Sequence, residues 1–190
     1  MDFIEEFYLD DLSICEKIIE FFETNPNQQH TGLVGTGIID TSVKNSLDIS
    51  IHPSQLYLNQ NKVLVEYLTL LKKCVEKYIK KYPDCNEYSS WKITEGINIR
   101  RYEPGQSFSA WHTERCSTSE NVRDRHLAFM TYLNSVQSGG GTEFKNQKRK
   151  INARRGKTII WPTDWTHTHR GIVSNKETKY IITGWFNYFN

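Results

Sequence analysis

The sequence lacks the features of several large protein classes. It has only four cysteines, none in a CxxC pair, so no disulfide framework is expected. No apolar run approaches the length of a membrane span, and the first residues are acidic, without the basic and apolar regions of a secretory signal. We therefore expect a cytoplasmic protein with reduced thiols and no membrane segment.

An excess of charge of one sign is also missing. The chain has 24 basic and 22 acidic residues and a formal net charge of +2, which gives no global attraction to nucleic acid or to an anionic membrane. Aromatic residues, by contrast, make up 13% of the sequence, and alternating stretches are clear, which indicates a folded, sheet-containing protein. At 190 residues, we expect one domain over 1–190, with a helical front over about 1–85 and a catalytic core over about 90–190.

The first half of the chain carries helical periodicity. Apolar residues recur at helical spacing over 12–22, and Pro26 should end this helix. A longer helix is expected over about 55–82, where Pro83 should end it. Residues 27–50 contain glycines between short β-branched stretches and predict turns with one or two weak strands.

The second half changes to a period of two. Alternating apolar residues over 91–99 predict two strands paired around the Glu95-Gly96 turn, and further strands are expected over 126–133, 157–161 and 178–188. Short strands with glycine and proline between them favour a sandwich or jelly roll. The expected class is α+β, mainly β, with the helices packed on one face.

Two potential metal ligands stand two residues apart in Trp111-His112-Thr113-Glu114. In an extended segment His112 and Glu114 point the same way, and an imidazole with a carboxylate supplies two ligands of the facial triad typical of non-haem iron(II) oxygenases. His-x-Glu is also a common pattern on protein surfaces. Either His167 or His169 could be the third ligand, and periodicity does not choose between them.

Lys179, Ile181, Thr183 and Trp185 share one face of the last predicted strand. A lysine on an inward face is costly unless an anion neutralises it. A small dicarboxylate whose far end meets Lys179 and Thr183 would supply that anion. A lysine at a strand end whose ammonium group extends to water would produce the same pattern.

The order of these motifs resembles that of the prolyl 4-hydroxylase-like branch of the 2-oxoglutarate/iron(II) oxygenases. The resemblance covers about residues 97–188. Its segments are Arg101-Tyr102-Glu103-Pro104-Gly105-Gln106, His112-x-Glu114, Phe129-Met130-Thr131-Tyr132-Leu133-Asn134, Gly140-Gly141-Thr142-Glu143-Phe144, Gly156-Lys157-Thr158-Ile159-Ile160-Trp161-Pro162, His169-Arg170-Gly171-x-Val173 and Lys179-Tyr180-Ile181-Ile182-Thr183-x-Trp185. The fold implied is a double-stranded β-helix, a jelly-roll variant with N-terminal supporting helices.

The resemblance implies an iron(II) ion held by His112, Glu114 and His169. It favours His169 over His167 because the His-x-Gly pattern and the ten-residue step to the lysine both fit His169. The family's usual second ligand is aspartate, and this chain has Glu114 instead, which keeps the charge and adds a methylene group. A site that folds without turning over is the alternative that this departure leaves open.

The same resemblance assigns residues to the co-substrate. Lys179 is implied to bind the distal carboxylate of 2-oxoglutarate, and Tyr102, Tyr132, Thr183 and Trp185 match positions associated with the co-substrate pocket. Molecular oxygen is the second co-substrate, and ascorbate is a candidate reductant.

The implied reaction is hydroxylation of an aliphatic C–H, with a peptidyl proline as the expected substrate and succinate and carbon dioxide as co-products. A nucleobase or a free amino acid is the alternative substrate, supported only by the basic residues over 145–157, for which a solvated hairpin face is the favoured interpretation. A non-catalytic jelly-roll binding module is the third hypothesis. The compact size and the Trp111-His112-Thr113-Glu114-Arg115 segment are similar to bacterial-virus-encoded members, for which the location would be the host cytoplasm.

Overall fold

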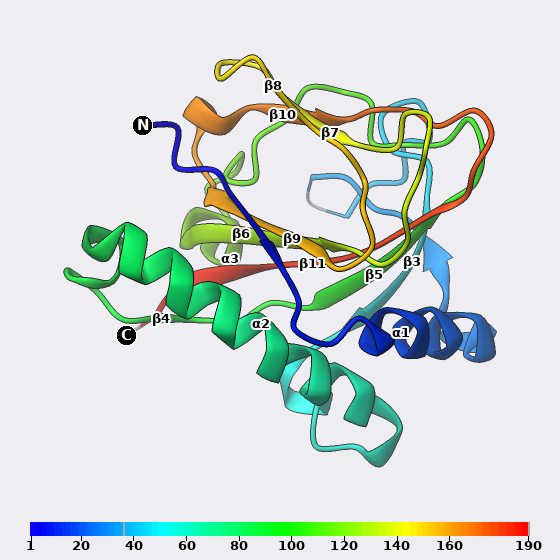
Figure 1. The fold of residues 1–190 in the computed structure, drawn as a ribbon, viewed down its shortest axis with the longest axis horizontal. Coiled ribbons are helices and arrows are strands. Elements are labelled where there is room, and N and C mark those ends of the chain that lie inside the picture. Colours follow the sequence, from blue (N-terminus) through cyan, green and yellow to red (C-terminus); the bar gives the residue numbers. More distant parts are fainter. Residues whose placement is uncertain (36, 190) are drawn as a thin grey trace.

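The computed structural model describes residues 1–35 and 37–189, and two antiparallel sheets dominate it (Figure 1). The strand order in the large sheet is β1 (Glu5–Tyr8), β9 (Lys157–Pro162), β6 (Arg125–Tyr132), β11 (Lys179–Tyr188), β5 (Ile97–Tyr102), β3 (Leu47–Ile51) and β2 (His30–Thr31), with β4 (Trp91–Lys92) paired to the end of β11. The small sheet has the order β10 (His169–Gly171), β7 (Thr142–Phe144) and β8 (Arg149–Ile151). The expected double-stranded β-helix is confirmed.

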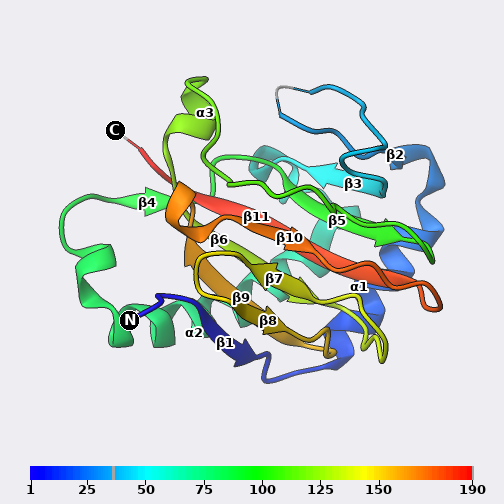
Figure 2. The same cartoon turned by 90° about the horizontal axis from the view of Figure 1, so that it is seen from above.

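Two helices cover one face of the large sheet, and the small sheet lies over the other face (Figures 1 and 2). Helix α1 spans Ser13–Thr24 and helix α2 spans Lys62–Lys81, while α3 is a single turn at Glu120–Arg123. Both long helices are amphipathic, which is why they bury one stripe against the sheet. Among the described residues, no helix combines the length and apolar character needed to cross a membrane.

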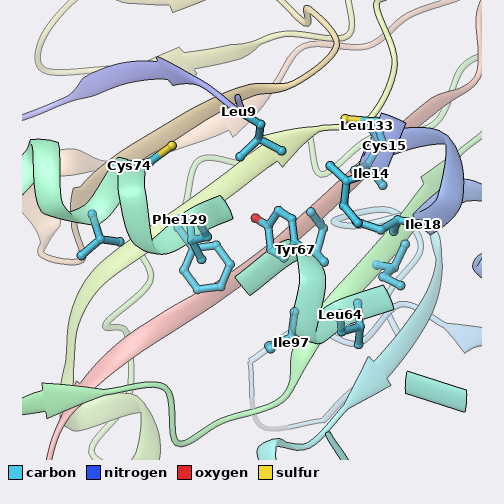
Figure 3. Close-up of a cluster of buried hydrophobic side chains, with 14 of the residues drawn as sticks. Leu9, Ile14, Cys15, Ile18, Leu64, Tyr67, Cys74, Ile97, Phe129 and Leu133 are labelled. Carbon is cyan, nitrogen blue, oxygen red and sulfur yellow. The ribbon is translucent and has the colours of Figure 1, made fainter. Parts of the chain in front are cut away.

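The core between the helices and the sheet is almost entirely apolar, and Figure 3 shows its centre. Ile18 of α1, Leu64 of α2 and Ile97 of β5 are all fully buried in it. The buried hydroxyl of Tyr67 is satisfied by Thr131 at 2.9 Å, so this polar atom costs the core little. A second, smaller cluster lies between the two sheets and includes Phe144 and Trp161.

A tight turn joins β6 to the small sheet. Gly139 has a φ of +77°, and a Cβ atom there would lie 2.0 Å from the carbonyl oxygen of Val173. Only glycine fits both the left-handed conformation and this close approach. A larger residue at position 139 would therefore clash with the backbone of Val173.

Several sequence predictions need correction. The second helix begins at Lys62, about seven residues later than expected, because 53–55 and 59–61 form separate 3₁₀ turns. The strands expected to pair around Glu95-Gly96 do not pair with each other. Instead, β4 pairs with β11, and β5 lies between β3 and β11 with both edges occupied.

Candidate metal centre and adjoining pocket

Three potential metal ligands meet between the two sheets. One ligand atom from each of His112, Glu114 and His169 lies within 4.8 Å of the others. His112 and His169 stand directly opposite each other: His112 N donates to His169 O at 3.0 Å, and His169 N donates to His112 O at 2.9 Å. This paired backbone brings the two imidazoles to one point, although 57 positions separate them in the sequence.

The two imidazoles are oriented for metal binding in the same way. Nδ1 of His112 lies 2.9 Å from the carbonyl oxygen of Ala110, and Nδ1 of His169 lies 2.9 Å from that of His167. A carbonyl oxygen accepts only from a protonated nitrogen, so each ring keeps its proton on Nδ1 and presents the Nε2 lone pair to the centre. Burial, reinforced by the neighbouring His169, lowers the pKa of His112 to about 3, which keeps it neutral as a ligand must be.

Glu114 is held at both ends. Its Oε1 lies 3.1 Å from Nε2 of His169, while Oε2 accepts a hydrogen bond from Nε1 of Trp185 at 2.9 Å. Its backbone oxygen accepts from Nη1 of Arg125 at 2.7 Å. Burial alone would raise the pKa of Glu114, but the polar side chains around it, His169 first and also His112 and Arg125, hold that pKa well below its usual range. The carboxylate is therefore ionised, with one oxygen fixed and the other aimed at the centre.

His167 lies outside this group. Residues 165–167 form a 3₁₀ turn, so the segment is not extended and the two histidines do not share a face. The imidazole of His167 is buried, with Nε2 at 2.8 Å from the carbonyl oxygen of Asp2 and Nδ1 at 2.9 Å from Oγ1 of Thr166. Both ring nitrogens are engaged, so His167 anchors the N-terminal segment.

A pocket opens beside the three ligands, and Lys179 lies in its wall. Lys179 is only 5% exposed, and its Nζ lies 4.5 Å from the ring centroid of Tyr102. Within the described part of the chain it forms no ion pair, and burial lowers its pKa to about 8. The alternative of a lysine that reaches bulk water at a strand end is therefore wrong. A buried cation without a counter-ion marks a place for an anion.

The other residues assigned to the co-substrate lie at different depths. Tyr102 and Thr183 line the pocket, and the Thr183 hydroxyl donates to the carbonyl oxygen of Phe129 at 2.8 Å. Tyr132 lies behind the wall, with its hydroxyl 2.7 Å from that of Thr142, which does line the pocket. Trp185 borders the neighbouring hollow and contacts Glu114. Of the four residues, Tyr102 and Thr183 thus line the pocket directly, whereas Tyr132 and Trp185 contact residues that line it.

Some lining residues had no role in the sequence analysis. Phe108 stacks on His112 with ring centroids 3.6 Å apart and planes 2° from parallel, and Trp161 packs edge-on against His169. Arg100 also lines the pocket. The alternation of β5 could have indicated Arg100, because Arg100 and Tyr102 share a face. Phe108 lies in a loop, where no periodicity signals its direction.

The donor set fits iron(II). Two neutral imidazoles and one carboxylate form a facial triad that leaves coordination positions open, and the open side faces a pocket that contains a cation. A dianion such as 2-oxoglutarate matches that pair of features, with one end at the metal and the other at Lys179. Together, the fold and the site define the class of double-stranded β-helix oxygenases.

Comparison with known proteins agrees with this class. Residues 97–187 match the model of the 2OG-Fe(II) oxygenase superfamily. A search of curated proteins by sequence finds no match. Residues 97–187 are therefore similar to the 2OG-Fe(II) oxygenase superfamily, and the fold of the whole described chain agrees with that similarity.

Solved structures show the same fold. A viral collagen prolyl hydroxylase from Paramecium Bursaria Chlorella virus-1 has a TM-score of 0.68 at 17% identity, over 99% of this chain and 97% of that one. A prolyl hydroxylase from Trichoplax adhaerens, in complex with a hypoxia inducible factor peptide fragment, has a TM-score of 0.75 at 14% identity, over 98% and 84%. A Pseudomonas putida prolyl-4-hydroxylase has a TM-score of 0.72 at 12% identity, over 100% and 95%. The expected prolyl 4-hydroxylase-like fold is confirmed.

Proposed function

We propose that this protein hydroxylates a proline residue in a peptide or protein, with iron(II) held by His112, Glu114 and His169 and 2-oxoglutarate held by Lys179. The observation that carries the proposal is the buried, unpaired Lys179 in the wall of the pocket that the three ligands border. A facial triad alone would suit many metals and reactions, whereas a triad beside a buried cation suits a dicarboxylate co-substrate.

When bound, iron(II) with 2-oxoglutarate and molecular oxygen supplies the oxidising power for inserting oxygen into a C–H bond, with succinate and carbon dioxide as co-products. The chain supplies orientation. The carbonyl oxygens of Ala110 and His167 fix the ligand imidazoles, and Trp185 holds the outer oxygen of Glu114. Such outer contacts are what keep metal ligands at their working geometry.

The rest of the pocket wall supports the chemistry by excluding water. Met130, Trp161 and Ile181 supply apolar surface beside the ligands, so the charge of Lys179 acts at low dielectric and attracts a carboxylate more strongly than it would in water. The hydroxyl of Thr183 donates its hydrogen bond to the carbonyl oxygen of Phe129, so its oxygen is free to accept a hydrogen bond from the pocket.

A peptide substrate is favoured over a nucleic acid by the charges around the basic segment. Arg149 pairs with Asp2 and Glu6 at 2.8 Å each, and Lys157 pairs with Glu6 at 2.6 Å. Lys150 also pairs with Glu143 and Arg155 with Glu16, so four of the seven basic residues over 145–157 are neutralised within the fold and fewer are free for phosphates. The structurally similar viral, Trichoplax and Pseudomonas proteins are all prolyl hydroxylases, which supports proline as the target residue.

The test combines two measurements on the purified protein. With iron(II), 2-oxoglutarate, ascorbate and oxygen, we expect succinate release that increases when proline-containing peptides are added. Mass spectrometry should then find one added oxygen atom on proline. A peptide-independent succinate signal that nucleosides or free amino acids stimulate, with no oxygen on proline, would overturn the substrate assignment. Absence of iron-dependent succinate release would overturn the enzymatic role.

A further inference from the structure

A second buried group of charges lies next to the metal centre. Asp48 of β3 and Arg100 of β5 are direct cross-strand partners, and Nε of Arg100 lies 3.3 Å from Oδ2 of Asp48. The same oxygen accepts a hydrogen bond from Nζ of Lys44 at 2.6 Å, and Oδ1 accepts one from Ser46 at 2.7 Å. Lys44 and Asp48 are 1% and 2% exposed, so this group is shielded from water.

Arg100 is the surplus cation of this group. Lys44 already neutralises Asp48 at short distance. The other groups near Arg100 are the hydroxyl of Tyr102 and the carboxylate of Glu114, which is one of the three potential metal ligands. The buried Nε of Arg100 donates no hydrogen bond within the described chain. Lys44 and Arg100 both lie beside Oδ2 of Asp48, and burial, followed by the charge of Arg100, lowers the pKa of Lys44 to about 8.

Arg100 also stands where a substrate would pass. It borders the metal pocket and a second hollow, which is lined by His112 and Glu114 but not by Lys179. Its lining also includes Leu33, Trp111 and Trp185, so a substrate bound there would lie next to the metal ligands without occupying the co-substrate pocket. The neighbouring cation, Arg125, is committed to Glu95 at 2.6 Å and to the backbone of Glu114.

A charge count identifies what is missing. An iron(II) ion, Glu114, the 2-oxoglutarate dianion and protonated Lys179 sum to zero. Lys44, Asp48 and Arg100 then leave one positive charge beside the metal, in surroundings where an unpaired charge is costly. One more carboxylate would neutralise this charge, and neither the described residues nor the co-substrate supplies it.

We propose that Arg100 is an anion-binding subsite for the substrate, and that it receives a carboxylate carried by an acidic residue near the hydroxylated proline. This inference rests on the proposed function for the identity of the neighbouring proline. The guanidinium group suits the role because it presents a planar pair of donors to a carboxylate. Lys44 and Asp48 fix its position across the sheet, so the ligand meets a cation that is already oriented.

The first test needs no peptide. The Nε–H resonance of Arg100, assigned by its loss in Arg100→Gln, is followed in the metal-free protein while acetate is added, with acetamide as the uncharged control of the same shape. We expect a saturable shift with acetate and none with acetamide. The resonance of Arg101, which faces the other side of β5 and pairs with Glu23 at 3.0 Å, should not move. An Arg100 resonance that ignores acetate would overturn the proposal.

The second test uses peptides with one central proline and a single aspartate placed at successive neighbouring positions, each matched by a peptide with asparagine there. We expect one aspartate position to raise the kcat/KM for hydroxylation by about tenfold or more over its asparagine partner. Arg100→Gln should abolish that preference, and the control variant Arg101→Gln should keep it.

The outcomes separate this inference from the proposed function. Hydroxylation without any preference for aspartate, or a preference that survives Arg100→Gln, would overturn the anion subsite. An acetate-responsive Arg100 together with no hydroxylation of any peptide would support the subsite and overturn the peptidyl proline assignment.

Discussion

The two faces of the large sheet contrast sharply although the same strands build them. On β11, Ile182 and Phe186 point to the helices and are buried among apolar side chains, whereas Lys179 and Thr183 point to the small sheet and line the metal pocket. Helices α1 and α2 seal the first face, and the small sheet covers the second only in part (Figure 1). One face therefore stabilises the fold, and the other holds polar groups in a geometry that folding alone would not favour.

This contrast explains how a small protein accommodates buried charge. Lys179 is largely removed from water and forms no ion pair within the described chain, so its charge costs free energy until a ligand arrives. The apolar face offsets that cost, since each large side chain buried there contributes about 1.5–3 kcal/mol. Substitutions on the face toward the small sheet should consequently weaken ligand binding, whereas substitutions on the helix-covered face should lower the stability of the fold.

The largest effect is expected at the metal ligands. His169→Ala should abolish binding of iron(II) or manganese(II), measured by calorimetry, because two ligands and an open pocket do not hold the ion. His167→Ala is the matched control two residues away, and it should keep metal affinity while losing some stability, since its imidazole bonds to Asp2 and Thr166. The reverse result would show that the wrong histidine has been assigned.

Lys179→Met should raise the KM for 2-oxoglutarate about a hundredfold, because removing one partner of a buried charge pair costs roughly 2–5 kcal/mol. Without the ligand, this variant should be as stable as the natural chain or more so, because a buried unpaired charge is gone. Lys157→Met is the control. That lysine pairs with Glu6, so its loss should lower the melting temperature and leave the KM unchanged.

On the helix-covered face, Ile182→Ala should reduce the free energy of unfolding by about 2–5 kcal/mol, measured by denaturant titration. The folded fraction should keep its KM for 2-oxoglutarate. Ile181→Ala, one residue earlier and in the pocket wall, should cost less stability and raise that KM. Equal stability losses in both variants would contradict the assignment of stability to one face and ligand binding to the other.

Trp185→Phe removes the hydrogen bond to Oε2 of Glu114 and keeps the aromatic volume. Loss of a contact that orients a metal ligand lowers metal affinity by about 10–100-fold, so we expect a drop in that range by calorimetry. Trp91→Phe is a suitable control, because Nε1 of Trp91 bonds to the carbonyl oxygen of Cys85, away from the metal site. Unchanged affinity in Trp185→Phe would mean that Glu114 needs no outer support.

The smallest predicted effect is a pH dependence. Burial lowers the pKa of Lys179 to about 8, and only the protonated amine attracts a carboxylate. The kcat/KM for 2-oxoglutarate should therefore fall as pH rises through about 8, by roughly fourfold between pH 7 and 8.5. Lys179→Arg, whose guanidinium stays protonated, should flatten this decline. A decline that persists in that variant would assign the titration to another group.

Much of the fold could be predicted from periodicity. The strands found as β6, β9 and β11 and the helix α1 lie within a residue or two of their expected ranges, because long periodic segments carry a strong local signal. The short strands β7, β8 and β10 were missed, since three residues give no period to detect. The pairing of β4 with β11 depends on contacts between distant segments, which local patterns do not encode.

The candidate site was predictable in part for similar reasons. His112 and Glu114 could be proposed from their spacing, and resemblance selected His169. The reason why His167 is excluded lies in the 3₁₀ turn at 165–167 and in its bond to Asp2, neither of which periodicity reveals. Arg100 was overlooked because a charged residue in a strand is normally expected to face solvent. Its burial becomes evident only when the pairing of β5 with β3 and β11 is known.

The most direct measurement is a crystal structure of the protein with manganese(II) and an inert 2-oxoglutarate analogue. We predict that Nε2 of His112, Nε2 of His169 and one carboxylate oxygen of Glu114 coordinate the ion, and that the distal carboxylate of the analogue contacts Nζ of Lys179. An ion bound elsewhere, or an analogue whose distal carboxylate avoids Lys179, would contradict the account.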